Sequence, residues 1–346
     1  MAVTVKIEDK SKKTTKGAVV EAAPAALTDY AAPGEHTESL KMFLIWVLCM
    51  LVLCVGLSSN IITQPFGIGI TIWWFVSVFI YFFLAPRILL RRLRMHGPEY
   101  ELTTQKNPRL KALVTKGSAM LGVSPPETFL VDEGTSQIRI LGRKDPYFMI
   151  VTQTAVDALE PPELDCLALR ALAHARMGHV RRLMMLQFLN DTPPTARMLV
   201  WPVGFYATLL MINWRWLADQ TADRVVLLLI KNHKLLTSAI LKQYAVSDPE
   251  MQQYKVTTQD VDNYIKQAGF IGMEGTEIST QYKLGAAIQG NPFLEDRIRA
   301  LSEWSRSPEY QEAINKLAEA RSGKSATGRA PAAPSASGSH PAPVKK

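Results

Sequence analysis

Two of the six histidines in this chain lie close together in the stretch ALAHARMGHVRR, which runs from residue 171 to residue 182. Two imidazoles at positions i and i+4 of a helix can bind one zinc ion, while a glutamate between them activates the metal-bound water. His174 and His179 are one residue further apart, so a continuous helix leaves them about 140° apart around its axis. They can share a metal only if the helix is locally distorted, as by a π-bulge.

The histidines need a scaffold, and the sequence predicts a mainly helical α+β domain over residues 96–321. A helix is expected over 107–123, followed by short strands over 128–133 and 147–153 that flank a polar connection. A short helix and a Pro-Pro break come next. A long helix from about 163 to 189 then carries both histidines.

The second half of this domain predicts further helices over 217–230, from Asn291 onward and over 308–321. Residues 198–214 are uncharged, and they are expected to form a buried, re-entrant or interfacial helix, or the second of two short spans of which the first uses part of 183–189. A single membrane crossing there is the alternative, and it would place the two halves of the domain on opposite sides. The tail, 322–346, has the composition of a disordered segment.

Two uncharged runs precede the domain, over 42–62 and 66–85, and each is long enough to cross about 30 Å of hydrocarbon as a helix. Three residues separate them, so they predict a transmembrane hairpin within residues 41–95. A helical hairpin buried in a soluble core is the alternative. Residues 1–40 predict a flexible leader.

Positive charge predicts the orientation of the hairpin. The formal net charge of +8 resides in a cluster after the second run and a cluster in the tail (Arg87, Arg91, Arg92, Arg94; Lys324, Arg329, Lys345, Lys346). The first cluster places the termini and the folded domain on the cytoplasmic side of an inner or plasma membrane. The rest of the chain is neutral, which argues against a nucleic-acid partner. The three cysteines form no disulfide framework, in keeping with a reducing compartment.

The order of these elements resembles the membrane zinc metallopeptidases of the HtpX and CAAX-prenyl-protease type. The phrases that carry the resemblance are NPRL, VTQTAVDALEPPELDCLALRALAHARMGHV, LADQTADRV and NPFLEDRIRAL, which together span about residues 107–305. The resemblance implies a zincin-like (gluzincin) scaffold behind the N-terminal transmembrane hairpin. It also implies a zinc site made by an H-E-x-x-H helix and a glutamate in a later E-x-x-A-D pattern.

The positions that carry the family's chemistry differ in this chain. An alignment on Gly178 and His179 places Ala175 at the first histidine and Arg176 at the glutamate. An alignment on His174 places Ala175 at the glutamate and leaves one residue too many before His179. Neither alignment supplies a general base, and loss of such a base costs about 10²–10⁴ in rate.

Two further family positions are altered. Asp219, followed by Ala222 and Asp223, stands where the resemblance places the third ligand, and Ser136, Gln137 and Ile138 stand at the substrate-binding edge strand. His179 and Asp219 remain candidate zinc ligands, with His174 joining them only if the helix is bulged. Asp219 and Asp223, four residues apart on one helix face, are the expected relics of the site, and ion pairs with Arg176, Arg181 or Arg224 are expected, above all Arg176 with Asp223. Zinc is therefore a doubtful cofactor.

The sequence thus predicts a catalytically impaired pseudopeptidase attached to the lipid bilayer, with membrane-protein segments or a partner protease as its binding partners. An active zinc endopeptidase with an unusual site is one alternative. A membrane scaffold that acts through its tails is another.

Overall fold

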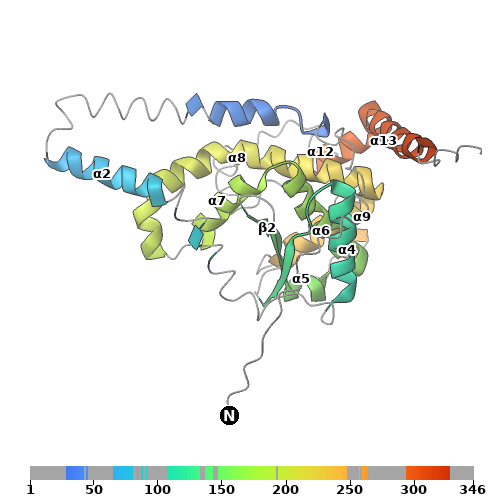
Figure 1. The fold of residues 1–346 in the computed structure, drawn as a ribbon, viewed down its shortest axis with the longest axis horizontal. Helices are drawn as coiled ribbons and strands as arrows, with labels where there is room; N and C mark the ends of the chain where they lie inside the picture. The colour runs from blue at the N-terminus through green and yellow to red at the C-terminus, as the bar shows by residue number, and fades with distance from the viewer. Residues whose placement is uncertain are drawn as a thin grey trace, which may run out of the picture.

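The computed structural model of this protein describes residues 29–42, 44–45, 65–80, 107–132, 137–142, 147–191, 194–247 and 294–327, with isolated positions in 84–91 and 257–266. Most of the predicted leader, most of the first apolar run and most of the tail lie outside these residues. The described part is mainly helical with one small sheet, which confirms the mainly helical α+β class (Figure 1).

Three short strands form that sheet, in the order β1-β3-β2. Strand β3 (Phe148–Thr152) lies in the middle with all its residues buried, parallel to β1 (Glu127–Val131) and antiparallel to β2 (Ile138–Leu141). Both expected strands are confirmed. Strand β2 was missed because it lies inside the segment expected to be a polar connection, although three of its four side chains are buried.

Helix α4 (Pro108–Leu121) confirms the first predicted helix. The Asn107 side chain accepts a hydrogen bond from the Leu110 N–H at its start, and Gly122, with φ of +64°, ends it. Helix α5 (Gln153–Ala158) and helix α6 (Pro161–Arg176) follow β3, and a capping box between Glu160 and Glu163 begins α6. Helices α4 and α6 pack together.

The predicted long helix over 163–189 is wrong, because the chain breaks between α6 and α7 (Val180–Asp191). Gly178 adopts a left-handed φ of +74°. The His179 N–H donates to the His174 carbonyl at 3.0 Å, and the Gly178 N–H donates to the Ala175 carbonyl at 3.1 Å. This pair of bonds is a Schellman motif, which glycine favours because it has no Cβ to strain the left-handed backbone. The histidines therefore do not lie on one helix.

Helix α8 (Pro194–Ile230) joins two segments that the sequence predicted as separate helices, 198–214 and 217–230. It is the long helix across the upper part of Figure 1, and α2 (Pro65–Phe79) packs against it. Helices α9 (His233–Ser247) and α12 (Leu294–Arg306) pack on α6 and α8 respectively. Helix α13 (Pro308–Thr327) ends six residues beyond the predicted boundary at 321, within the segment expected to be disordered.

Residues 29–42 also depart from the prediction of a flexible leader. Ala32 is buried, residues 35–42 are helical, and the segment lies beside α8 (Figure 1). Among the described residues, no helix combines the length and the apolar character that a membrane crossing requires. The second apolar run overlaps α2, whose side chains include the exposed Ile72, Phe75 and Phe79.

Candidate functional site

The break between α6 and α7 brings the two histidines into contact. The Nδ1 atoms of His174 and His179 lie 3.1 Å apart, and both side chains are buried. A continuous helix would have pointed the imidazoles in different directions. The left-handed turn at Gly178 instead redirects the chain after α6 and brings the His179 ring against the His174 ring.

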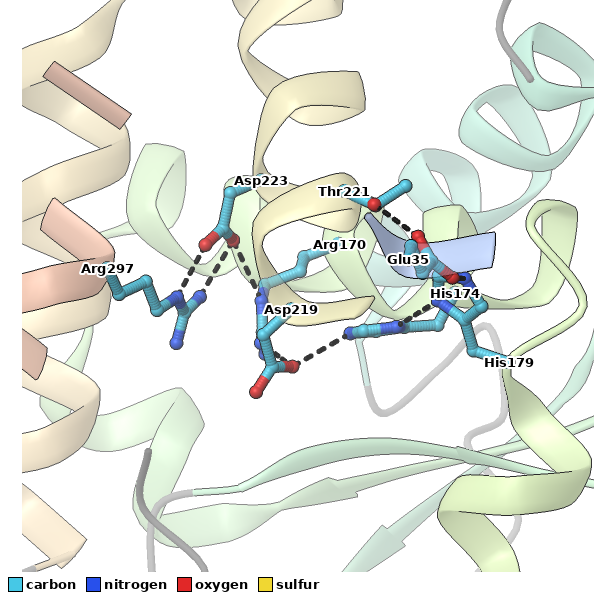
Figure 2. A network of polar contacts seen from close by, with 8 residues as sticks. All are labelled: Glu35, Arg170, His174, His179, Asp219, Thr221, Asp223 and Arg297. Atoms are coloured by element: carbon cyan, nitrogen blue, oxygen red, sulfur yellow. Dashed lines mark hydrogen bonds and ion pairs between the residues drawn. The ribbon is translucent and has the colours of Figure 1, made fainter. Parts of the chain in front are cut away.

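Glu35, which the sequence analysis did not identify as a site residue, contacts this pair through His179. The Oε1 atom of Glu35 lies 2.7 Å from Nε2 of His179, and the Thr221 hydroxyl of α8 donates to Oε2 (Figure 2). Burial alone would raise the pKa of Glu35, but the contacts with His179 and Thr221 outweigh it and lower the pKa overall. The turn-forming Pro33-Gly34 pair directly before Glu35 was the available signal.

Asp219 of α8 contacts the other histidine of the pair, because its Oδ1 lies 3.4 Å from Nε2 of His174. Burial lowers the pKa of His174 to about 4, with the charge of Arg170 adding to the effect and the contact with Asp219 opposing it. His174 is therefore neutral at pH 7. Glu35, His179, His174 and Asp219 form one continuous chain of polar contacts (Figure 2).

Both ring nitrogens of each histidine face protein groups. His179 contacts the Glu35 carboxylate through Nε2 and the His174 ring through Nδ1, and Nε2 of His174 faces the Asp219 carboxylate. One of the two facing Nδ1 atoms donates a proton and the other accepts it, according to the tautomers of the two rings.

Asp219 and Asp223, one turn apart on α8, are held by arginines. Arg170 of α6 contacts both carboxylates, with its Nε 3.0 Å from Oδ1 of Asp223, and Arg297 of α12 contacts Asp223 through two nitrogens (Figure 2). Burial alone would raise the pKa of Asp219, but Arg170 and His174 outweigh it and hold the pKa well below its usual range. Both aspartates are buried, and each is paired with at least one arginine.

The expected pair of Arg176 with Asp223 is not among these contacts. Asp223 pairs with Arg170 and Arg297 instead, and Nε of Arg176 is buried without a hydrogen-bond partner. Arg170 lies one helical turn before His174, on the same face of α6, so its guanidinium reaches the carboxylates of α8. Ala175 is buried and brings no functional group to the site.

This arrangement does not fit zinc. A zinc site needs at least three protein ligands whose lone pairs converge on one point. Both nitrogens of His179 and Nδ1 of His174 are engaged with protein groups, which leaves Nε2 of His174 and the arginine-bound Asp219. Within the described part of the chain, no cluster of three or more histidine, cysteine, aspartate or glutamate side chains is arranged to hold a metal ion.

The proposed substrate-binding strand adjoins the site. Ile138 begins β2, at an edge of the sheet, and both α6 and α7 pack on this strand. The Gln137 backbone exchanges hydrogen bonds with Thr152, and Ile138 pairs with Val151, so the described residues of this stretch are bound to β3. Ser136 lies outside the described residues.

In comparisons with known proteins, the chain matches no family model, and no curated protein or solved structure is significantly similar to it. The resemblance to HtpX-type peptidases therefore rests on the order and spacing of the motifs in the sequence.

Proposed function

We propose that this protein is a membrane-anchored pseudopeptidase of the HtpX type, which binds membrane-protein segments or a partner protease without cutting them. The observation that carries this proposal is that the guanidinium of Arg170 forms ion pairs with both Asp219 and Asp223. The resemblance places a zinc ligand at Asp219. A cation already paired with that carboxylate opposes the binding of Zn²⁺ there.

The lack of a glutamate at the catalytic position that the resemblance gives on α6 supports the same proposal. Ala175 and Arg176 stand where the resemblance places the catalytic glutamate. Peptide hydrolysis needs an activated water, which metallopeptidases obtain from zinc together with a carboxylate. The resemblance implies a surface shaped for polypeptide, and in a scaffold that has lost both, binding is the function that such a surface supports.

Attachment to the lipid bilayer through the two apolar runs belongs to this proposal. Its support is the uncharged sequence over 42–62 and 66–85 and the apolar side chains that α2 exposes. The arginines after the second run support a cytoplasmic location of the folded domain.

Metal stoichiometry tests the proposal. Detergent-purified protein, exposed to zinc and then dialysed, is expected to retain no zinc by elemental analysis. The variant Arg170→Met, which removes the cation but keeps a long side chain, is the comparison that shows whether Arg170 opposes the metal. About one zinc per wild-type chain, lost in His179→Ala, would overturn the proposal.

A second candidate, an active zinc endopeptidase, gains support from one observation. Glu35 brings a carboxylate to the histidines, in place of the glutamate that the resemblance expects beside them on α6. This candidate predicts chelator-sensitive cleavage of a membrane-protein or peptide substrate by the wild type and loss of that cleavage in Glu35→Gln. The pseudopeptidase proposal predicts no cleavage by either protein.

A further inference from the structure

Residues 29–42, named here the strap, lie against the candidate site as a bound peptide would. The strap turns at Gly34, with φ of +89°, and continues as a helix from residue 35. Its Ala32 N–H donates to the Thr221 hydroxyl at 2.8 Å, and its Glu35 carboxylate contacts both His179 and Thr221. One turn further on, the Ser39 hydroxyl accepts a hydrogen bond from Arg182 at 2.6 Å.

The groups that hold the strap come from three separate elements. His179 lies in the turn between α6 and α7, Arg182 lies in α7, and Thr221 lies in α8. Together these three residues are named the strap-binding surface. Each recognises one feature of a peptide: Thr221 a backbone N–H, His179 a carboxylate, and Arg182 a hydroxyl group one helical turn later.

The charges of this surface match an acidic ligand. Arg182 stacks over the ring of Trp214 at 4.9 Å, which orients its guanidinium. Burial lowers the pKa of Arg182, and the negative charge of Glu35 opposes that effect. A carboxylate on the ligand therefore offsets positive charge that is costly to leave unpaired.

The strap is held by polar and apolar contacts. Ala32 is buried, Tyr30 and Met42 pack against buried apolar clusters, and Leu40 is 53% exposed. A segment held by a few hydrogen bonds and a few apolar side chains can be replaced by another segment that makes the same contacts. The covalent link to the domain is then the strap's main advantage, because it raises the local concentration of the segment.

We infer that the strap-binding surface is a binding site for an acidic peptide and that the strap is its displaceable intramolecular occupant. The ligand is a segment of a partner protein with a small residue, a turn, a glutamate and then a helical turn that carries a hydroxyl group. This inference rests on the proposed function, because it names the class of segment that the pseudopeptidase binds. The strap and the partner segment therefore compete for the strap-binding surface.

A synthetic peptide of residues 29–41 with a fluorescent label provides the test, with full-length protein in detergent and fluorescence anisotropy as the readout. In Glu35→Gln the strap binds the strap-binding surface more weakly. The labelled peptide is therefore expected to bind this variant at least tenfold more tightly than it binds the wild type. Glu38→Gln is the matched control, because Glu38 pairs with Lys41 within the strap and does not contact the site. It is expected to behave like the wild type.

The peptide itself supplies the second comparison. A peptide with glutamine in place of its site-facing glutamate should bind Glu35→Gln at least tenfold more weakly than the acidic peptide does. Equal affinity of the acidic peptide for wild type and Glu35→Gln, or equal affinity of the two peptides, would overturn the inference. If Glu35→Gln lacks a cooperative thermal transition, Ser39→Ala replaces it. The peptide is then expected to bind Ser39→Ala several-fold more tightly than the wild type.

Failure of this inference is distinguishable from failure of the proposed function. The binding experiment is done with chelator present, so it does not depend on zinc. Cleavage of the peptide without chelator would overturn the pseudopeptidase proposal and leave the binding result standing. Absence of peptide binding by a protein that retains no zinc would overturn the inference alone.

Discussion

Glu35 of the strap accepts a hydrogen bond from Nε2 of His179, 2.7 Å away, although the two residues belong to segments that are far apart in the sequence. This contact places a carboxylate beside a histidine that the sequence offered either as a buried helix residue or as a zinc ligand. The same carboxylate accepts a hydrogen bond from Thr221 of α8. The candidate site therefore consists of residues from the strap, the turn between α6 and α7, and α8.

The buried His174 makes stability depend on pH. Its pKa is about 4 in the folded protein, whereas an unfolded histidine titrates near 6.5. As the pH falls below about 6.5, the unfolded state takes up a proton that folded His174 does not, so the free energy of unfolding decreases until about pH 4. The decrease amounts to about 3 kcal/mol, and denaturant titrations at a series of pH values measure it.

His174→Gln should flatten this pH dependence between pH 6.5 and 5, where the carboxylates of Glu35 and Asp219 do not yet titrate, because their folded pKa values are lowered. His36→Gln is the control, because His36 is exposed. An unchanged slope in His174→Gln would contradict the assignment.

Removal of Arg170 should be strongly destabilising. Arg170→Met leaves Asp219 buried without its cation and removes one of the two arginines that pair with Asp223. Removing one partner of a buried ion pair costs about 3–5 kcal/mol. Arg109→Met is the matched control, because Arg109 forms a solvent-exposed pair with Asp165. That change should cost about 0–1 kcal/mol in the same denaturant titration. Similar losses in the two variants would show that the Arg170 network contributes little.

Gly178 tests the turn between α6 and α7. Gly178→Ala forces a Cβ into a left-handed backbone, which costs about 1–2 kcal/mol, and no neighbouring atom lies close enough to add a clash. Gly178→Asn should cost less, because asparagine tolerates this conformation. Thermal denaturation ranks the three proteins, and equal midpoints for the alanine and glycine proteins would argue against a left-handed turn.

The apolar runs should bind the protein to membranes. After expression, the protein is expected to stay in the membrane fraction during extraction at high pH with carbonate and to dissolve only in detergent. Phe75→Asp tests α2, where Phe75 is exposed. A charged residue at the centre of a spanning helix costs about 2.5–3.5 kcal/mol in insertion, so the variant should appear partly in the soluble fraction. Complete extraction of the wild type by carbonate would contradict this prediction.

The sequence by itself determined those elements whose signals are local. Helix α4 was predictable from the Asn107-Pro108 start and the Gly122 stop, and strands β1 and β3 were predictable from their short apolar runs. The mainly helical α+β class follows from these patterns. Asp219 and Asp223 were recognised as a pair because a spacing of four residues places them on one helix face.

Only the tertiary structure decided how the candidate site is assembled. The apolar pattern across residues 163–189 favoured one helix, and it outweighed the stop signal at Gly178, whose left-handed turn brings His174 and His179 together. Arg170, rather than Arg176, reaches the acidic pair because the crossing of α6 and α8 selects which face of α6 points toward α8. Glu35 joins them because the strap lies beside α8. Local pattern specifies helices and turns, but contacts between distant segments depend on packing, which no spacing in the sequence encodes directly.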